Sequence, residues 1–296
     1  MTRGQSLSAK QLIDGFSSYL TGGSREPVAT RIFLKALVCY MVIRLILLWP
    51  VCRVMLHYHR MVLPGSLLWK IILAPSYLAD QHPDAFFVVA IALAIVLLYT
   101  IPHHAANFLF CWLTVNVYYI HSQTGDGSDL MLLMLSVWCV PMVPVSLTDS
   151  GKPKIIQITL FNLGRLFCQF ATIFIYLSSG VDKLASATWR SGYAFEYIRH
   201  LEGLYNPHFP ALFQNHAWDL VLSWITILLE LAFGVLVWQK QFRTTVLLCA
   251  AVFHLVIWWM VSLPDFSVIM IVSLLIFVND DDYDVRAAQR RVRRDG

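Results

Sequence analysis

Charged residues are scarce in this chain of 296 residues. Asp, Glu, Lys and Arg together make up 14% of it, whereas soluble domains carry about 25%. Apolar residues make up 58%, against roughly 45–50% in soluble domains. This shortage of charge excludes an ordinary soluble domain and offers no surface for nucleic acid. The composition predicts an all-α protein whose helices cross a lipid bilayer many times.

The usual signatures of soluble enzymes and metal sites are also missing. The sequence holds no P-loop, dinucleotide-binding fingerprint, GxSxG motif or metal-ligand spacing. The six cysteines form no CxxC pair, and all lie in or beside apolar runs: Cys39, Cys52, Cys111, Cys139, Cys168 and Cys249. We interpret them as small buried apolar side chains and expect neither a disulfide framework nor a bound metal.

The first 30 residues lack the continuous apolar core of a cleavable signal peptide, so we expect none. Five apolar residues in this segment have helical spacing: Leu12, Ile13, Phe16, Tyr19 and Leu20. Their pattern fits either a short amphipathic helix on the membrane surface or a partly ordered tail.

A membrane-spanning helix needs about 20 mostly apolar residues. About eight segments approach this requirement, of which the last is short: 31–52, 85–101, 105–122, 130–147, 155–179, 216–238, 244–262 and 265–279. We therefore predict a transmembrane domain over residues 31–279. It lies between a cytoplasmic amphipathic tail (1–30) and a charged cytoplasmic tail (280–296).

Basic residues gather in alternate loops. Lys152 and Lys154 occupy one loop, Lys240 and Arg243 a later one, and five arginines the final tail. With eight spans, these loops lie on the same side as the N-terminus. The positive-inside rule then places both termini in the cytoplasm and residues 180–215 on the outer face. The outer segments 53–84 and 180–215 also carry basic residues, which suggests that these cations have a task there.

A stripe of polar residues runs along the predicted span 155–179 and beyond its end. Its members are spaced alternately three and four apart, which places them on one face of a helix: Asn162, Arg165, Gln169, Thr172, Tyr176, Ser179 and Lys183. Because polar groups facing lipid are costly, this face should contact other helices or a wet cavity. The stripe is either an interhelical hydrogen-bond seam or part of a functional site.

A second set follows Lys183 at helical spacing: Trp189, Tyr193, Glu196, Tyr197 and His200. It predicts either an interfacial helix with aromatic anchors or a lid that brings Glu196 and the rings over a cavity.

Three buried ionisable residues in other spans need partners. Glu230 lies near the middle of a span, and its available partners are Arg165, Arg44 and Lys183. His254 is either a hydrogen-bonded core histidine or a chemical participant, and Arg44 is most simply a structural ion-pair partner. Lys183 could be a base if desolvation kept it neutral, although a facing Asp182 would oppose this.

The segments "YLSSGVDKLASATWRSGYAFEY", "LELAFG" and "FHLVIWWMVSLPDFSVIMI" together resemble the HTTM domain family. This is the membrane half of the vitamin K-dependent gamma-carboxylases and their bacterial relatives. Lys183 matches the family's catalytic-base lysine, and six positions match its surrounding motif: Gly180, Trp189, Gly192, Tyr193, Glu230 and His254. The chain length and the segment "TGDGSDLMLLMLSVWCVPMVPVSLTDS" are closer to the compact bacterial branch, the sporulation-delaying protein B type.

The resemblance implies a quinol cofactor such as vitamin K hydroquinone, or the maturation of a secreted peptide precursor together with a small partner protein. With the polar pattern, it gives Lys183, His254 and Glu230 as candidate catalytic residues. The candidate substrate-binding residues are Arg165, Gln169, Tyr176, Trp189, Tyr193 and Glu196. Three functions stay open: a peptide-modifying or peptide-maturing protein, a quinone- or lipid-linked membrane enzyme, and a transporter or immunity protein whose polar stripe is a permeation path.

Overall fold

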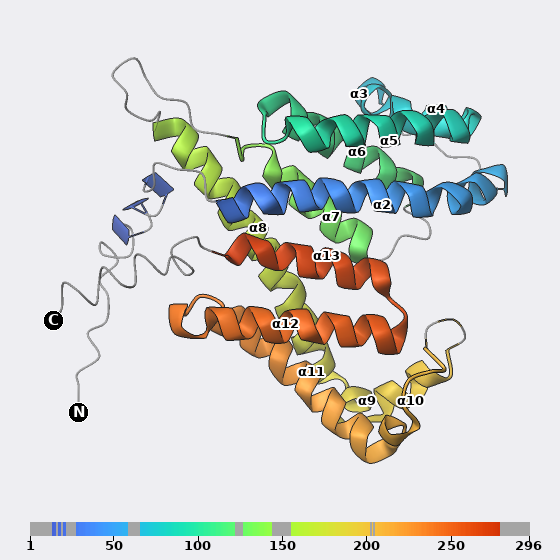
Figure 1. Cartoon of the computed structure of the whole chain (residues 1–296), viewed down its shortest axis with the longest axis vertical. Helices are drawn as coiled ribbons and strands as arrows, with labels where there is room; N and C mark the ends of the chain where they lie inside the picture. The colour runs from blue at the N-terminus through green and yellow to red at the C-terminus, as the bar shows by residue number, and fades with distance from the viewer. Residues whose placement is uncertain are drawn as a thin grey trace.

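The computed structural model describes residues 14–15, 17–18, 20–21, 28–58, 66–121, 127–143, 155–201, 203 and 205–278. Within these ranges the regular structure is entirely helical (Figure 1), which confirms the predicted all-α membrane fold. Most of the predicted N-terminal tail, the basic residues Lys152 and Lys154, and the charged tail 280–296 lie outside the described residues.

A helix occupies each of the eight predicted spans. They are α2 (Val28–Tyr58), α5 (Pro83–Thr100), α6 (His104–His121), α7 (Gly127–Cys139), α8 (Ile155–Ala185), α11 (His216–Leu236), α12 (Lys240–Val261) and α13 (Pro264–Leu274). Five of them, α2, α5, α8, α11 and α12, are long and apolar enough to cross a bilayer. The short helix η2 (Leu275–Phe277) extends α13.

The two long segments predicted as outer loops contain helices. After α2, which runs on to Tyr58, come α3 (Leu67–Ile72) and α4 (Ala74–Gln81). Ser66 caps α3 by accepting a hydrogen bond from the Trp69 amide (3.4 Å). The second segment begins with the last turns of α8 and continues with α9 (Ala187–Arg190), α10 (Tyr193–Arg199) and η1 (Ala211–Phe213).

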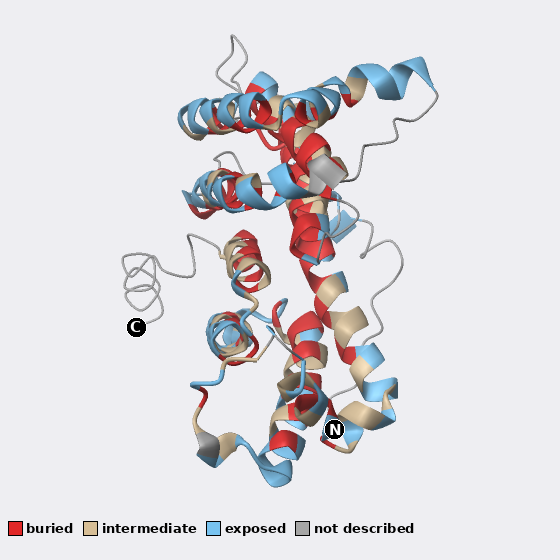
Figure 2. Cartoon of the chain, turned by 90° about the vertical axis from the view of Figure 1, so that its right-hand side faces the viewer, coloured by how far each residue is buried: buried red, intermediate tan, exposed pale blue. Residues whose placement is uncertain are grey.

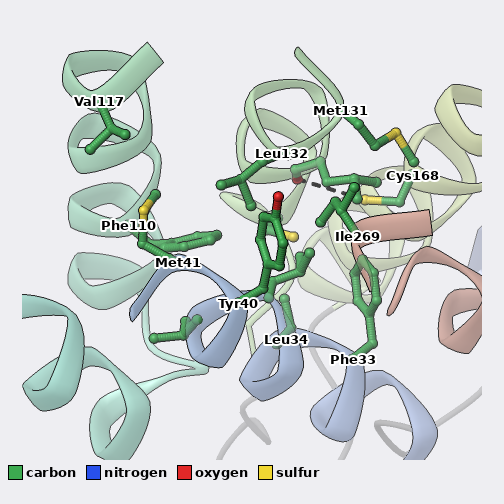
Figure 3. Close-up of a cluster of buried hydrophobic side chains, with 14 of the residues drawn as sticks. Phe33, Leu34, Tyr40, Met41, Phe110, Val117, Met131, Leu132, Cys168 and Ile269 are labelled. Carbon is green, nitrogen blue, oxygen red and sulfur yellow. Dashed lines mark hydrogen bonds between the residues drawn. The ribbon is translucent and has the colours of Figure 1, made fainter. Parts of the chain in front are cut away.

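The main hydrophobic core lies around α2, which packs chiefly on α5 and also on α6 and α13, and the core continues into α7 and α8. Figure 3 shows Phe33 and Leu34 of α2 near Ile269 of α13, with Phe110 and Met131 from two other helices. Buried residues lie on the inward faces of the helices and exposed residues on the outward faces (Figure 2). The outward faces remain apolar, as a bilayer requires.

The cysteines follow this pattern only in part. All six are free thiols, and Cys52, Cys139 and Cys168 are buried as predicted. Cys39 and Cys249 are exposed, so the prediction of burial was wrong for these two. Both lie on outward faces of apolar helices, where sequence hydropathy does not distinguish a lipid-facing side chain from a core side chain.

A charged cluster joins four helices inside the bundle. The Arg44 guanidinium of α2 donates to both carboxylate oxygens of Asp129 in α7, at 3.0 and 2.9 Å, and also to Asp265 in α13. His121, the last residue of α6, lies 2.7 Å from the same Asp129 carboxylate. Arg44 is therefore a structural ion-pair partner, and the cluster avoids the cost of an isolated buried charge.

The helices run between two ends of the bundle. α2 begins and η2 ends at the left of Figure 1, whereas α9 and α10 lie at the lower right. α11 and α12 are joined by only three residues, 237–239. From this turn the two helices diverge toward the end that carries α9 and α10 (Figure 1). Their divergence makes room for the cavity described next.

Candidate active site

A cavity of about 610 Å³ lies among α8, α11, α12 and α13, with α9 and α10 at one end. Its volume falls in the range of about 300–1,000 Å³ that is usual for small-molecule sites. Most of its wall is apolar, and a few polar side chains reach it from three helices: Tyr176, Ser179, Lys183, Thr226, Glu230 and His254.

Lys183 and Glu230 form an ion pair at the wall of this cavity. The Lys183 Nζ atom lies 2.9 Å from each carboxylate oxygen of Glu230 and also donates to the Ser179 hydroxyl. Ser179 in turn donates to Glu230 Oε1 at 3.2 Å. The side chains of Lys183 and Glu230 are only 17% and 8% exposed. Of the partners expected for Glu230, the structure selects Lys183.

The surroundings of Lys183 match its charge. The Trp189 ring centroid lies 5.0 Å from Nζ, within the range of a cation–π contact. Asp182, the neighbour in sequence, is exposed, and the carboxylate bonded to the amine comes from Glu230 instead.

Two glycines allow α8 and α11 to approach closely enough for this pair. A β-carbon on Gly180 of α8 would lie 3.0 Å from Leu231 and 3.1 Å from Glu230. A β-carbon on Gly234 of α11 would lie 2.5 Å from Leu177. Small residues at helix contacts let membrane helices pack backbone to backbone. Here they bring the Glu230 carboxylate within reach of Lys183.

A second polar pair lies about two helical turns from Lys183, roughly 10 Å along α8. The Tyr176 hydroxyl and His254 Nε2 are 2.7 Å apart, and both side chains are buried. The Tyr176 ring also stacks on Phe233, with ring centroids 4.0 Å apart. His254 Nδ1 is buried and has no hydrogen-bond partner in the described part of the chain. This pair can orient a polar group or relay a proton.

The first half of the polar stripe has a structural role. Gln169 Nε2 donates to the Ile276 carbonyl at 3.2 Å, and Arg165 donates to the carbonyls of Ile276 and Val278. These carbonyls belong to the end of η2, where a helix leaves acceptors without intrahelical partners. Arg165 and Gln169, predicted to bind substrate, therefore lie away from the cavity. The stripe is a seam in its first half and a cavity wall from Tyr176 to Lys183.

The predicted helical face from Trp189 to His200 is interrupted. α9 ends at Arg190, Gly192 has a positive φ of 84°, and α10 starts at Tyr193. A β-carbon on Gly192 would lie 2.8 Å from the Leu220 backbone, so the close approach of α11 also requires glycine here. The prediction of one continuous face was wrong because the break rotates α10 relative to α9.

This rotation changes which side chains reach the cavity. Trp189 lines it, whereas the predicted ligands Tyr193 and Glu196 do not. Tyr193 is exposed and its ring lies 4.7 Å from that of His216. Phe195 and Ile198 of α10 line the cavity instead.

The sequence-based prediction did not include the apolar residues that line the cavity, because it rested on the spacing of polar residues. Glu230 shares its helical face with Leu222, Thr226 and Leu229, and all of these line the cavity. Extending the face of Glu230 by steps of three and four would have found them. On the α12 wall the polar guide is His254, from which Ile257 and Val261 follow at steps of three and four.

An ion pair joins α10 to α11 near the end of the site. Both terminal nitrogens of Arg199 in α10 bind the carboxylate of buried Asp219 in α11. These hydrogen bonds raise the pKa of Arg199 above its ordinary value.

No group of three His, Cys, Asp or Glu side chains able to hold a metal occurs within the described ranges. No protein family model, curated protein or solved structure matches this chain.

Proposed function

We propose that this integral membrane protein is an enzyme that exchanges a proton with the polar head of a lipid-soluble substrate or cofactor. The observation that carries the proposal is the Lys183–Glu230 pair, which lies at the wall of a mostly apolar cavity. A buried ion pair is often no more stabilising than well-packed apolar residues of similar volume. Stability alone therefore does not explain why two charged residues lie at this wall.

The pair offers a base in two steps. The amine and the carboxylate lie within hydrogen-bond distance, so a proton can pass directly between them. A proton passing from Lys183 Nζ to Glu230 leaves a free amine. That amine takes the proton of a substrate hydroxyl: an N–H bond forms, the O–H bond breaks, and the oxyanion lies beside the new ammonium.

A quinol, which the HTTM resemblance implies, fits these residues. Lys183 and the Tyr176–His254 pair would hold its hydroxyl groups, and unsatisfied His254 Nδ1 leaves this pair incomplete without a ligand. Apolar residues such as Phe253 and Ile257 would hold its ring and chain. A quinol supplies an ionisable hydroxyl and can be oxidised. Lys183 would receive the proton while the apolar wall excludes water.

Peptide maturation is a second candidate. α10 exposes Tyr193 and Tyr197 beside the site, which is a surface on which a secreted peptide could lie. The HTTM resemblance supports this function, with a small partner protein. Mass spectrometry of secreted peptides from cells with and without the gene tests it directly, since a matured peptide must disappear when the gene is deleted.

We also propose that α9 and α10 face the outside of the cell, with both termini in the cytoplasm. Lys240 and Arg243 lie at the start of α12, at the opposite end of the bundle. Exposed Trp258 and Trp259 lie near the end of α12, in keeping with an aromatic belt at the outer interface.

The main experiment compares cells that produce the wild type, Lys183→Ala or Lys183→Arg at equal abundance. Lipid extracts and secreted peptides are analysed by mass spectrometry. We expect both variants to accumulate a lipid-soluble precursor that the wild type converts. Arginine should fail because its guanidinium does not release a proton at accessible pH. Identical lipid profiles in all three strains would contradict the proposal.

A further inference from the structure

We infer that the cavity is entered sideways from the bilayer between α11 and α12, and that its ligand is an uncharged lipid bearing a hydroxyl group. This inference rests on the proposed function for the reaction that follows binding, and it adds the route and the substrate class. The opening, here called the lateral portal, is formed by Ile225, Leu248, Cys249 and Val252.

The portal residues line the cavity and are exposed at the same time. Ile225 is 51% exposed, Leu248 62% and Val252 58%. Ile225 is the tenth residue of the 21 in α11, and Leu248 and Val252 are the ninth and thirteenth of the 22 in α12. Both helices are long and apolar enough to cross the bilayer. An opening halfway along two such spans, lined by apolar side chains, faces hydrocarbon and not water.

Side chains close the cavity at the end that carries α9 and α10. Phe195 packs against Met260 and Val261, and the Trp189 ring meets Phe195 edge to face with centroids 5.5 Å apart. The Arg199–Asp219 ion pair fastens α10 to α11 above this layer. The described residues therefore block direct entry from the aqueous phase at this end.

Aromatic rings close the opposite end. Phe233 stacks on Tyr176 and meets Phe277 edge to face, with centroids 5.6 Å apart. Trp238, in the turn between α11 and α12, packs on the same Phe277. With both ends filled, the lateral portal is the route that the described side chains leave open.

The distribution of polar groups indicates the ligand. Lys183 and Glu230 lie on α8 and α11. Apart from His254, α12 contributes mainly apolar side chains such as Phe253, Val256 and Ile257. A ligand therefore needs a polar head and an apolar chain. The ion pair is neutral as a whole, so a phosphate or carboxylate head would add an unmatched negative charge in a desolvated site. A hydroxyl head adds none and can donate to Glu230 or to the free amine of Lys183.

Photocrosslinking tests both the route and the ligand class. The full chain is placed in phosphatidylcholine nanodiscs with hexadecan-1-ol that carries a diazirine in its chain, and adducts are mapped by mass spectrometry. We expect adducts on Phe253 and Ile257, inside the cavity. Hexadecanoic acid with the same diazirine, measured at alkaline pH, should label these two residues about tenfold less, a difference of about 1.4 kcal/mol.

Matched tryptophan variants test the portal. Val252→Trp fills the mouth from α12, and Ile225→Trp fills it from α11. Leu255→Trp and Leu228→Trp are the controls, since these side chains are exposed on the same helices but do not line the cavity. Each portal variant should lower interior labelling by the alcohol about tenfold, and the controls should retain it. Two portal variants on different helices guard against a folding defect in one.

Equal interior labelling in portal and control variants would overturn the route, and equal labelling by the acid would overturn the ligand class. The proposed function is judged separately by Lys183→Ala. Portal-dependent labelling without any effect of Lys183→Ala on lipid profiles would leave the inference standing and remove the proposed reaction. If Lys183→Ala abolished the reaction while labelling did not depend on the portal, the proposed function would stand and the lateral route would be excluded.

Discussion

Gly180 of α8 lies directly against Glu230 of α11: a β-carbon at Gly180 would come within 3.1 Å of the Glu230 β-carbon. The residue that allows this contact is one turn from Lys183, the partner of the same glutamate. The packing of α8 on α11 and the Lys183–Glu230 ion pair therefore both depend on the absence of a side chain at Gly180. Adding one methyl group at this position tests both.

Gly180→Ala should push α8 and α11 apart by a few tenths of an ångström and weaken the ion pair. Overpacking of this kind costs about 1–3 kcal/mol, which thermal unfolding in detergent would show as a lower melting temperature. Gly15→Ala is the control, since a β-carbon there meets nothing within 4 Å. A melting temperature for Gly180→Ala equal to that of the control would mean that the interface is looser than described.

Stability and activity should separate in variants of the ion pair. Lys183→Ala leaves the Glu230 carboxylate buried without its cation, and breaking such a pair costs about 3–5 kcal/mol. The double variant Lys183→Met with Glu230→Leu removes both charges and should recover most of that loss. It should nevertheless be inactive, because no proton acceptor remains. Thermal unfolding and lipid profiles measured together check this, and activity in the double variant would exclude Lys183 as the base.

The stability contributed by the Arg199–Asp219 ion pair should not change with pH over the physiological range. Hydrogen bonds to Asp219 raise the pKa of Arg199. The stability gained is complete below the pKa of arginine in the unfolded chain, which lies far above the physiological range. It is lost only as pH rises through the still higher folded value. Asp219→Asn should therefore lower stability by a similar amount at about pH 6 and about pH 9. Hydrogen exchange in α10 measures this, and a loss confined to one pH would contradict the expectation.

The proposed orientation can be checked with single cysteines. After the six native cysteines are replaced, Gly203→Cys should react in intact cells with a maleimide that cannot cross the membrane. Lys152→Cys should react only after the cells are opened, because the charge pattern places residue 152 in the cytoplasm. Labelling of both positions in intact cells would remove the orientation proposed above.

The polar stripe on α8 could be predicted because it depends only on helical periodicity. Tyr176, Ser179 and Lys183 share a face in any α-helix. The partner of Glu230 could not be selected from Arg165, Arg44 and Lys183 in the same way. That choice depends on which helices pack together, and therefore on the space left by Gly180 and Gly234.

Four residues predicted to bind substrate do not line the cavity, and each case has a specific structural reason. Arg165 and Gln169 bind carbonyl groups at the end of η2, and the end of a neighbouring helix is not visible in their own segment. Tyr193 and Glu196 left the predicted face because Gly192 adopts a positive φ. A glycine in a helical pattern permits such a break, but only the close approach of Leu220 requires it.

The Arg44 cluster has a consequence for biosynthesis. Arg44 enters the membrane with the first span, yet its acceptors Asp129 and Asp265 are synthesised 85 and 221 residues later. Until then the arginine lacks both carboxylates, at a cost of about 2.5–3.5 kcal/mol at the centre of a membrane helix. This cost disfavours release of the first helix into lipid before α13 has been made. A ribosome that stalls before Asp265 would leave an unfinished chain with a partly compensated arginine, which quality-control proteases can recognise.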